Sequence, residues 1–338
     1  MQIFKTSCSL VNLSIILLLP SVSLAQGNSP SLTIRTTSSL PSTTIYANGN
    51  MQAKLIVSYK NIPNGYKVEK LSLKEAYTSN NLPSTWVKSH IDHGYDGDIN
   101  VHRSATRNQI NQNSNSQIFY LSTRDSNSDI TVCAELVAAN ANGNRQTLST
   151  CNGDTNNGLV HVAVISEINY GIEDLDHVTN REWYEDHSYA ISQEKFTLRN
   201  NRQIRDVGGC DTSIINNGKR YLISSTNGPA HPYSGHHKYG AVYLFKPNRG
   251  VVTSNFPYSN NTKWLETVTL SFNTTNSLSF AVLHGQDNQK TYVNPLINWV
   301  IHCPIVTFRD NYGNEGILNI SRHSSPDDKW GSVYYKFH

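Results

Sequence analysis

Residues 133–151 read CAELVAANANGNRQTLSTC, and this stretch decides the fold class. Its cysteines, Cys133 and Cys151, each stand nine residues from Asn142. The dipeptide Asn142-Gly143 is the strongest short-range hairpin signal, because both residues tolerate the positive φ of a tight turn. A hairpin folded about Asn142 places the cysteines opposite each other, at a Cα separation of roughly 4.5–5.5 Å that a disulfide can span. The stretch therefore predicts a disulfide-stapled hairpin in a strand-built protein from an oxidising compartment.

The N-terminus is typical of a secretory signal peptide. Lys5 precedes a short apolar run over Leu10–Leu19, and Ser23 and Ala25 supply small residues at the −3 and −1 positions of a cleavage site. No later stretch reaches the roughly 18 apolar residues that a membrane-spanning helix needs. We therefore expect a signal peptide over residues 1–25, no transmembrane segment, and a mature protein that is secreted through the periplasm.

The other cysteines predict a second disulfide. Cys8 leaves with the signal peptide, and the four remaining cysteines allow three pairings. Because the hairpin pairs Cys133 with Cys151, elimination pairs Cys210 with Cys303. Free buried thiols are the alternative, and zinc is disfavoured because the chain has no C-x₂-C pair.

Length and composition favour two all-β domains. Roughly 310 mature residues exceed the usual size of a single core. The chain holds 39 asparagines and only 16% charged residues, which favours Asn-rich turns between short strands over long helices. The net charge of +3 is too small to indicate nucleic-acid binding, and we expect none.

Alternating apolar residues predict many short strands. Ile130, Val132 and Ala134 fall on one face of their strand, with Cys133 on the other. The segment 159–165 is apolar on both faces except at His161, and it predicts a strand deep in a sheet. Strands are expected at 32–34, 51–59, 68–73, 118–121, 130–137, 146–150, 159–165, 196–198, 221–224, 241–245, 267–272, 278–284, 299–301, 305–308, 317–320 and 333–337. This spacing, with Gly, Asn and Pro between strands, is typical of immunoglobulin-like β-sandwiches.

An acidic segment separates the two predicted domains. Residues 167–186 hold seven acidic residues and one arginine, which is typical of a solvated connector, with calcium binding as the alternative. Thr179–Asp186 can form a short helix. We expect an N-terminal sandwich over 26–166, the acidic connector over 167–188 and a C-terminal sandwich over 189–338.

Two strands of the C-terminal domain predict a hairpin. Val268, Leu270 and Phe272 share one face, and the turn Asn273–Asn276 leads into the strand 278–284. An amphipathic hairpin over Thr267–His284 in an exported all-β protein is compatible with membrane insertion, so a pore-forming toxin is one alternative function.

The best candidate site is the loop Ser225–Tyr239, which reads STNGPAHPYSGHHKY. Its candidate binding residues are His231, Tyr233, His236, His237 and Tyr239. Rigid recognition is the favoured role. The imidazoles also leave open a metal site, as in a metal-assisted hydrolase that uses His231, His236 and His237, or a base beside Ser234. G-x-S-x-G, H-E-x-x-H and Walker motifs are missing from the chain. We therefore expect a protein that is not an enzyme and needs no cofactor.

A basic region surrounds this loop. Residues 195–250 hold nine Lys or Arg side chains against two acidic residues. Arg202, Arg205, Lys219 and Arg220 are the candidates for contacting an anionic glycan or an acidic partner protein. Neutralisation by the acidic connector and a scattered solvated face are the alternatives. A smaller cluster around Trp86, with His90, His93 and Tyr95, is interpreted as a loop whose tryptophan anchors it in the core.

Two short phrases resemble exported enterobacterial proteins. Ile45–Leu55 reads IYANGNMQAKL and Val306–Asn314 reads VTFRDNYGN, and both are similar to strand-and-turn phrases in the immunoglobulin-like modules of invasin and intimin-type surface proteins. With the signal peptide, the chain most resembles the ZirS-like secreted passengers of the Zir export system. The resemblance implies a protein that modulates host interaction or virulence, with an outer-membrane export barrel or a host-surface protein as partner.

Together these features predict a secreted, adhesin-like binding protein that acts through loops of its C-terminal domain. The pore-forming toxin and the metal-assisted hydrolase remain the alternatives.

Overall fold

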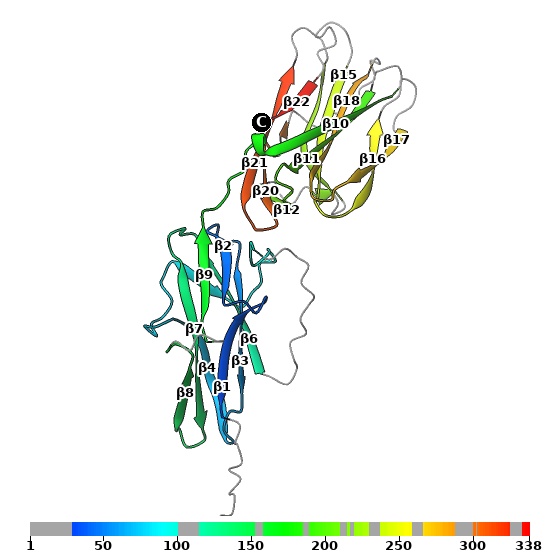
Figure 1. Ribbon diagram of the computed structural model, residues 1–338. Coiled ribbons are helices and arrows are strands. Elements are labelled where there is room, and N and C mark those ends of the chain that lie inside the picture. The colour runs from blue at the N-terminus through cyan, green and yellow to red at the C-terminus, as the bar shows by residue number, and fades with distance from the viewer. Residues whose placement is uncertain are drawn as a thin grey trace, which may run out of the picture.

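The computed structural model describes residues 29–100, 115–152, 158–184, 189–209, 215–216, 220–229, 237–258, 266–287, 300–301, 303–324 and 333–338. These residues form 22 strands and one three-residue 3-10 helix, Ile172–Asp174, with no α-helix among them. The all-β prediction is confirmed. We call residues 29–165 the N-terminal half and 168–338 the C-terminal half, and Figure 1 shows the two stacked end to end.

Two sheets build the N-terminal half. The first has the order β1 (Ser31–Thr36), β3 (Ala53–Lys60), β6 (Asn115–Thr123) and β5 (Trp86–Ser89). The second has the order β2 (Ser42–Tyr46), β9 (Val160–Ile165), β7 (Ile130–Asn140) and β4 (Tyr66–Glu75), with β8 (Arg145–Ser149) also paired to β7. Only β2 and β9 run parallel among these pairs. Strand β9 lies between β2 and β7, as expected, but only one of its faces is buried, because His161 and Ile165 on the other face are exposed.

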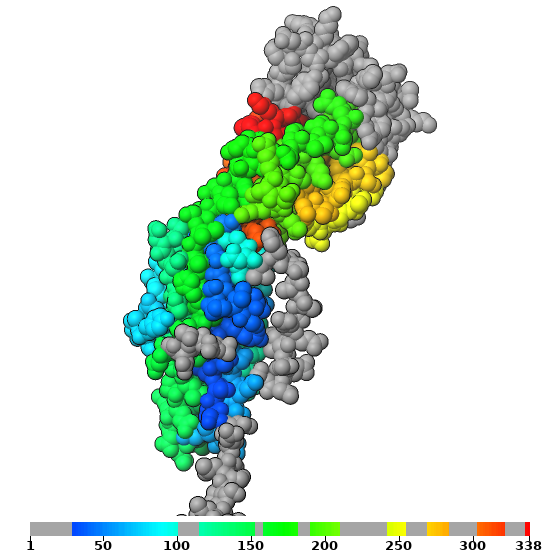
Figure 2. All heavy atoms as spheres, in the orientation of Figure 1, coloured from blue at the N-terminus to red at the C-terminus, as the bar shows by residue number. Residues whose placement is uncertain are grey.

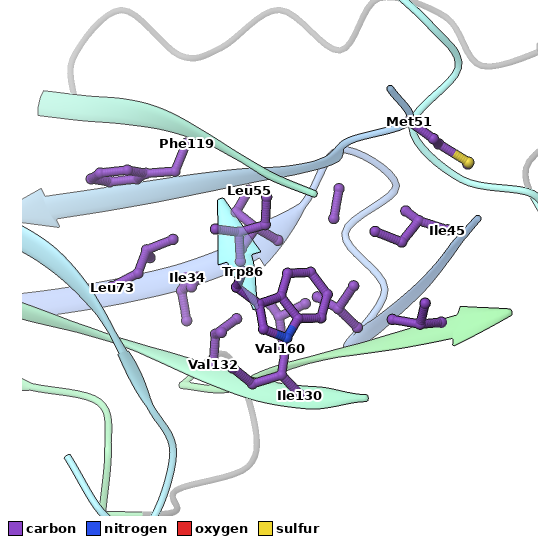
Figure 3. Packing of buried hydrophobic residues seen from close by; sticks show 14 of the residues in the cluster. Ile34, Ile45, Met51, Leu55, Leu73, Trp86, Phe119, Ile130, Val132 and Val160 are labelled. Carbon is purple, nitrogen blue, oxygen red and sulfur yellow. The ribbon is translucent and has the colours of Figure 1, made fainter. Parts of the chain in front are cut away.

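Alternate residues from both sheets fill one core. Leu55 faces it from β3, and Val132 faces it from β7 (Figure 3). Val57 of β3 belongs to the same cluster. Trp86 is 6% exposed, and its indole nitrogen donates to the carbonyl of Ser128 at 3.0 Å. The tryptophan therefore anchors its strand in the core, and its one polar group is satisfied.

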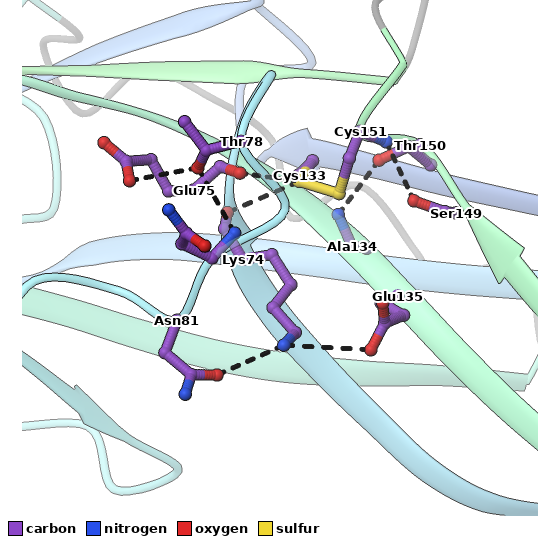
Figure 4. Close-up of a disulfide and its surroundings, with 11 residues drawn as sticks. Lys74, Glu75, Thr78, Asn81, Cys133, Ala134, Glu135, Ser149, Thr150 and Cys151 are labelled. Carbon is purple, nitrogen blue, oxygen red and sulfur yellow. Dashed lines mark hydrogen bonds and ion pairs between the residues drawn. A yellow bond between two sulfur atoms is a disulfide. The ribbon is translucent and has the colours of Figure 1, made fainter.

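The disulfide hairpin is confirmed. Strands β7 and β8 pair in the register that is centred on Asn142, and Cys133 and Cys151 are bonded with their Cα atoms 5.0 Å apart (Figure 4). The turn is longer than two residues. A two-residue type I′ turn would need positive φ at both Asn142 and Gly143, and of these two only Gly143 has it, at 79°. The side-chain oxygen of Asn140 accepts hydrogen bonds from two backbone N–H groups of the turn, each at 3.0 Å.

The C-terminal half contains a seven-stranded sheet that other strands cover on each face. Its order is β10 (Leu175–Tyr184), β11 (Tyr189–Leu198), β18 (Leu278–Asp287), β15 (His237–Phe245), β14 (Arg220–Pro229) and β13 (Ile215–Asn216), with β19 (Val300–Ile301) paired to β14. A second sheet has the order β12 (Ile204–Gly208), β20 (Ile305–Asp310), β21 (Glu315–Ser324) and β22 (Val333–Phe337). Strands β16 (Val251–Tyr258) and β17 (Glu266–Asn273) form a separate ribbon.

Strand alternation explains how both faces of the large sheet become covered. Phe280 and Val282 of β18 pack against the second sheet, together with Phe308 of β20. The intervening Ala281 and Leu283 pack against the β16–β17 ribbon. Side chains on a strand point alternately to opposite faces, so one apolar run serves two cores.

Every expected strand overlaps an observed one, but two local predictions are wrong. The helix over 179–186 is wrong because Leu175–Tyr184 is strand β10, paired along its length with β11. The hairpin Thr267–His284 is wrong because β17 pairs with β16, whereas β18 pairs with β11 and β15. The turn after Asn273 thus passes the chain from one sheet to another.

The second predicted disulfide falls partly outside the described residues. Cys303 is disulfide-bonded and 2% exposed within the C-terminal core. Cys210 lies outside the described residues, so its pairing with Cys303 stays a prediction.

Candidate functional sites

The structure separates the predicted binding residues into two groups. His237 and Tyr239 lie at the start of β15, beside Pro229 at the end of β14, whereas Arg220 begins β14 and pairs with Phe245. A ten-residue strand spans roughly 30 Å, so these positions lie at opposite ends of the sheet. His231, Tyr233, His236 and Lys219 lie outside the described residues.

Arg202 lies at the junction between the two halves. Its guanidinium pairs with the buried carboxylate of Asp310 at 3.1 Å and donates to the hydroxyl oxygen of Tyr170 at 3.2 Å. A further hydrogen bond reaches across the junction to the Tyr46 hydroxyl. The guanidinium carbon also stands 5.1 Å from the Tyr46 ring centre and 5.3 Å from that of Tyr312, which is a cation–π arrangement. Arg202 therefore joins residues of both halves.

The turn between β20 and β21 holds the acceptors for this network. One Asp310 oxygen accepts from the backbone N–H groups of Tyr312 and Asn314, at 2.8 and 2.9 Å. The other oxygen accepts from the Tyr170 hydroxyl at 2.8 Å and the Asn314 amide at 3.1 Å. Asp310 is fully buried, so these donors and Arg202 replace its lost hydration.

The turn between β2 and β3 meets that turn directly. The Asn48 amide donates to the Tyr312 carbonyl and to the Asn314 side-chain oxygen, each at 3.1 Å, and the Asn50 amide donates to the Gly313 carbonyl at 3.0 Å. The Tyr312 ring packs into the core of the N-terminal half. The two phrases 45–55 and 306–314 are therefore strand-and-turn segments that contact each other.

A second contact lies beside the first, in the loop after β5. Asp96 and Asn311 exchange two hydrogen bonds, at 2.8 Å through the backbone and 2.7 Å through the side chains. The Arg205 guanidinium carbon stands 5.5 Å from the Tyr95 ring centre. Arg205, like Arg202, thus contacts the N-terminal half. The sequence also allowed the acidic segment to neutralise the basic region. One described ion pair is of this kind, since Arg199 pairs with Asp176 at 3.1 Å.

Burial perturbs the tyrosines of the junction. Burial raises the pKa of Tyr170 well above its ordinary value of 10.0, and the Asp310 charge raises it further. Burial likewise raises the pKa values of Tyr95 and Tyr312. All three hydroxyls therefore remain neutral hydrogen-bonding groups across the physiological pH range.

The smaller cluster around Trp86 is divided among different contacts. A ring nitrogen of His90 lies 3.0 Å from the Ile118 carbonyl, and one of His93 lies 3.3 Å from the Asn50 carbonyl. In the part of the chain that the structure describes, no group of three or more His, Cys, Asp or Glu residues is arranged to hold a metal ion. The same residues include no helix long and apolar enough to cross a membrane.

No family model and no curated protein matches the chain.

Sequence reasoning missed the junction as a site. The turn signals in Asn48-Gly49-Asn50 and Asn311-Tyr312-Gly313-Asn314 were visible, but turn signals do not say that two turns meet. The one available clue was chemical: Arg202 and Asp310 are charged residues that each flank a predicted core strand. Their pairing spans more than a hundred residues of sequence, and it follows from the pairing of β12 with β20 inside the C-terminal half, which the sequence does not reveal.

Proposed function

We propose that this chain is an exported binding protein made of two immunoglobulin-like sandwich domains. In this proposal the N-terminal domain is a spacer, and the polar junction around Arg202 and Asp310 holds the C-terminal domain at a set angle. The main cores of the two halves are separate clusters, and this supports the division, with Tyr170 and Leu175 already belonging to the C-terminal cluster. We place the domain boundary at 166–169, ahead of most of the acidic segment.

The observation that carries the proposal is the direction of the C-terminal strands. The strand ends Tyr184, Pro229 and Asp287 lie at the same end of the seven-stranded sheet, because Tyr184 pairs with Tyr189, Tyr189 with Gly285, and His237 with both Pro229 and Asp287. This end of the sheet is the one farther from the N-terminal half (Figure 1). Five connections, which follow Tyr184, Pro229, Tyr258, Asp287 and Ser324, lie outside the described residues. Loops clustered at one end of a rigid sandwich are where recognition residues usually lie.

The sequence of these five connections is rich in the side chains that dominate protein interfaces. They hold three of the five tryptophans of the chain, Trp264, Trp299 and Trp330, together with Tyr233 and Tyr292. Trp and Tyr are enriched among residues whose truncation costs an interface most of its affinity. A protein partner fits this composition better than an anionic glycan, since Arg202 and Arg205 are engaged at the junction. The host-surface protein and the outer-membrane export barrel are the two candidate partners.

The proposal is tested by saturation binding of the mature protein to host-cell surfaces and to outer-membrane preparations. The variants Trp264→Ala and Trp330→Ala alter the distal connections, and Val87→Ala is the control, because Val87 is an exposed apolar residue of the N-terminal half. We expect each tryptophan variant to weaken binding at least tenfold and the control to leave it unchanged. Equal binding by all three folded variants would refute recognition through the distal end.

A further inference from the structure

A second exposed feature lies on the N-terminal half, in the loop Ala76–Asn81 between β4 and β5. Tyr77 is 72% exposed, and the four residues after it are exposed as well. The backbone of Tyr77 has a φ of 66°, and Ser79 has a φ of 56°. Both residues are thus in the left-handed region, which a bulky aromatic residue adopts rarely and at a cost.

The loop is held firmly against its sheet. The N–H groups of Ala76 and Tyr77 donate to the carbonyls of Thr131 and Cys151, at 2.9 and 3.3 Å. Ala76 is buried in a small cluster with both bonded cysteines, so the disulfide lies directly under the loop. Figure 4 shows the hydroxyl of Thr78 donating to the Glu75 carboxylate, at 3.1 Å.

This arrangement needs an explanation, because strain and exposure occur at the same residue. A glycine or an asparagine would adopt the same backbone conformation at less cost. The conformation directs a large aromatic ring into solvent from a backbone that cannot relax. Strained backbone held in place by its surroundings is commonly found at binding sites.

We propose that the loop Tyr77–Asn81 is a binding site for the sugar ring of a neutral glycan. The Tyr77 ring offers a flat apolar face for the C–H groups of one sugar. The side chains that follow it are hydroxyls and amides, which can donate to and accept from sugar hydroxyl groups. The loop sequence Tyr-Thr-Ser-Asn-Asn therefore combines one rigid aromatic group with adaptable hydrogen-bonding groups.

Size and charge decide between a glycan and other partners. A stable protein interface covers about 800 Å² on each partner, which is more than one five-residue loop offers. The two charged side chains at the base of the loop are already engaged: Lys74 donates to Asn81 at 3.1 Å and faces Glu135 at 3.9 Å, and Glu75 accepts from Thr78. No charge of the loop is thus left to select an acidic sugar.

The test applies the mature protein to an array of neutral oligosaccharides of glucose, galactose, mannose and N-acetylglucosamine, with sialylated forms alongside. We expect binding to at least one neutral glycan with a Kd of about 1 mM or tighter. Tyr77→Asn should weaken it about tenfold, whereas Tyr77→Phe, which keeps the ring, should stay within about threefold. Ser39→Gly is the matched control, because Ser39 also has a left-handed φ, of 61°, and lies outside the proposed binding loop.

Thermal unfolding of the same variants separates binding from folding. Asparagine adopts the left-handed region at less cost than tyrosine, so Tyr77→Asn should leave the Tm unchanged or raise it while it weakens glycan binding. Saturation-transfer NMR with the strongest neutral glycan should show contact with aromatic protons that disappears in Tyr77→Asn. Absence of neutral glycan binding, binding that survives Tyr77→Asn, or a Tm lowered by that variant would each overturn the proposal. None of these results depends on the distal end of the C-terminal half.

Discussion

Replacing Arg202 with alanine removes the guanidinium that pairs with the buried carboxylate of Asp310. Breaking a buried ion pair by removing one partner costs about 3–5 kcal/mol, because the other charge stays buried. Asp310 keeps hydrogen bonds from Tyr170, Tyr312 and Asn314, and the Arg202 side chain is 20% exposed, so part of that cost is offset. We therefore expect Arg202→Ala to lower the free energy of unfolding by about 2–3 kcal/mol.

Urea unfolding of the mature protein measures this loss. The matched control is Arg145→Ala, since Arg145 forms an exposed ion pair with Glu69 at 3.1 Å and should lose less than about 1 kcal/mol. A double-mutant cycle of Arg202→Ala with Tyr46→Phe then isolates the contact across the junction, with an expected coupling of about 0.5–3 kcal/mol. If Arg202→Ala costs no more than the control, or if the coupling is zero, the reasoning about the junction is refuted.

Three further predictions concern the disulfide, the buried tyrosines and the contact of Tyr312 with the N-terminal core. Replacing Cys133 and Cys151 together by serine should lower the free energy of unfolding by about 3 kcal/mol in urea, because the bridge closes a loop of 18 residues; no change would contradict its stabilising role. Because the pKa of Tyr170 is raised in the folded protein, the folded protein keeps the hydroxyl proton above about pH 10, whereas the unfolded chain loses it. The contribution of Tyr170 to stability is therefore complete below about pH 10 and declines above that pH. Urea unfolding between about pH 8 and 11.5 should show this decline, and Tyr170→Phe should reduce it; a profile that is flat above pH 10 would be the opposite result. Tyr312→Ala should cost about 3–5 kcal/mol by the same measurement, as a buried ring is lost, whereas a cost below 1 kcal/mol would show that the ring does not belong to the N-terminal core.

Local signals in the sequence predicted the strands and the stapled hairpin well. Asn142-Gly143 set the register that joins Cys133 to Cys151, because turn chemistry and strand alternation act over neighbouring residues. The position of β9 between two other strands was also visible from its apolar run, although only one of its faces is buried.

Pairing between distant strands could not be predicted in the same way. The segment 267–284 has two apolar strands and a turn, yet Asn273 and Leu278 belong to different sheets, because each strand gains more by pairing with another partner. Strand β10 was hidden by its charged residues, which are tolerated at the edge of a sheet. Arg202 was predicted to contact an external partner, and its charge gave no indication that it faces Asp310 instead.

The junction that joins the two halves is tested most directly by a pulsed electron-spin distance measurement. Spin labels carried by non-cysteine amino acids at Val87 and Val251, both exposed and in different halves, report the distance between the halves without disturbing the disulfides. A fixed junction predicts one narrow distance distribution, which should broaden when Asn48 and Arg202 are both replaced by alanine. A broad distance distribution in the unaltered protein that these replacements do not change would contradict a fixed junction between the two halves.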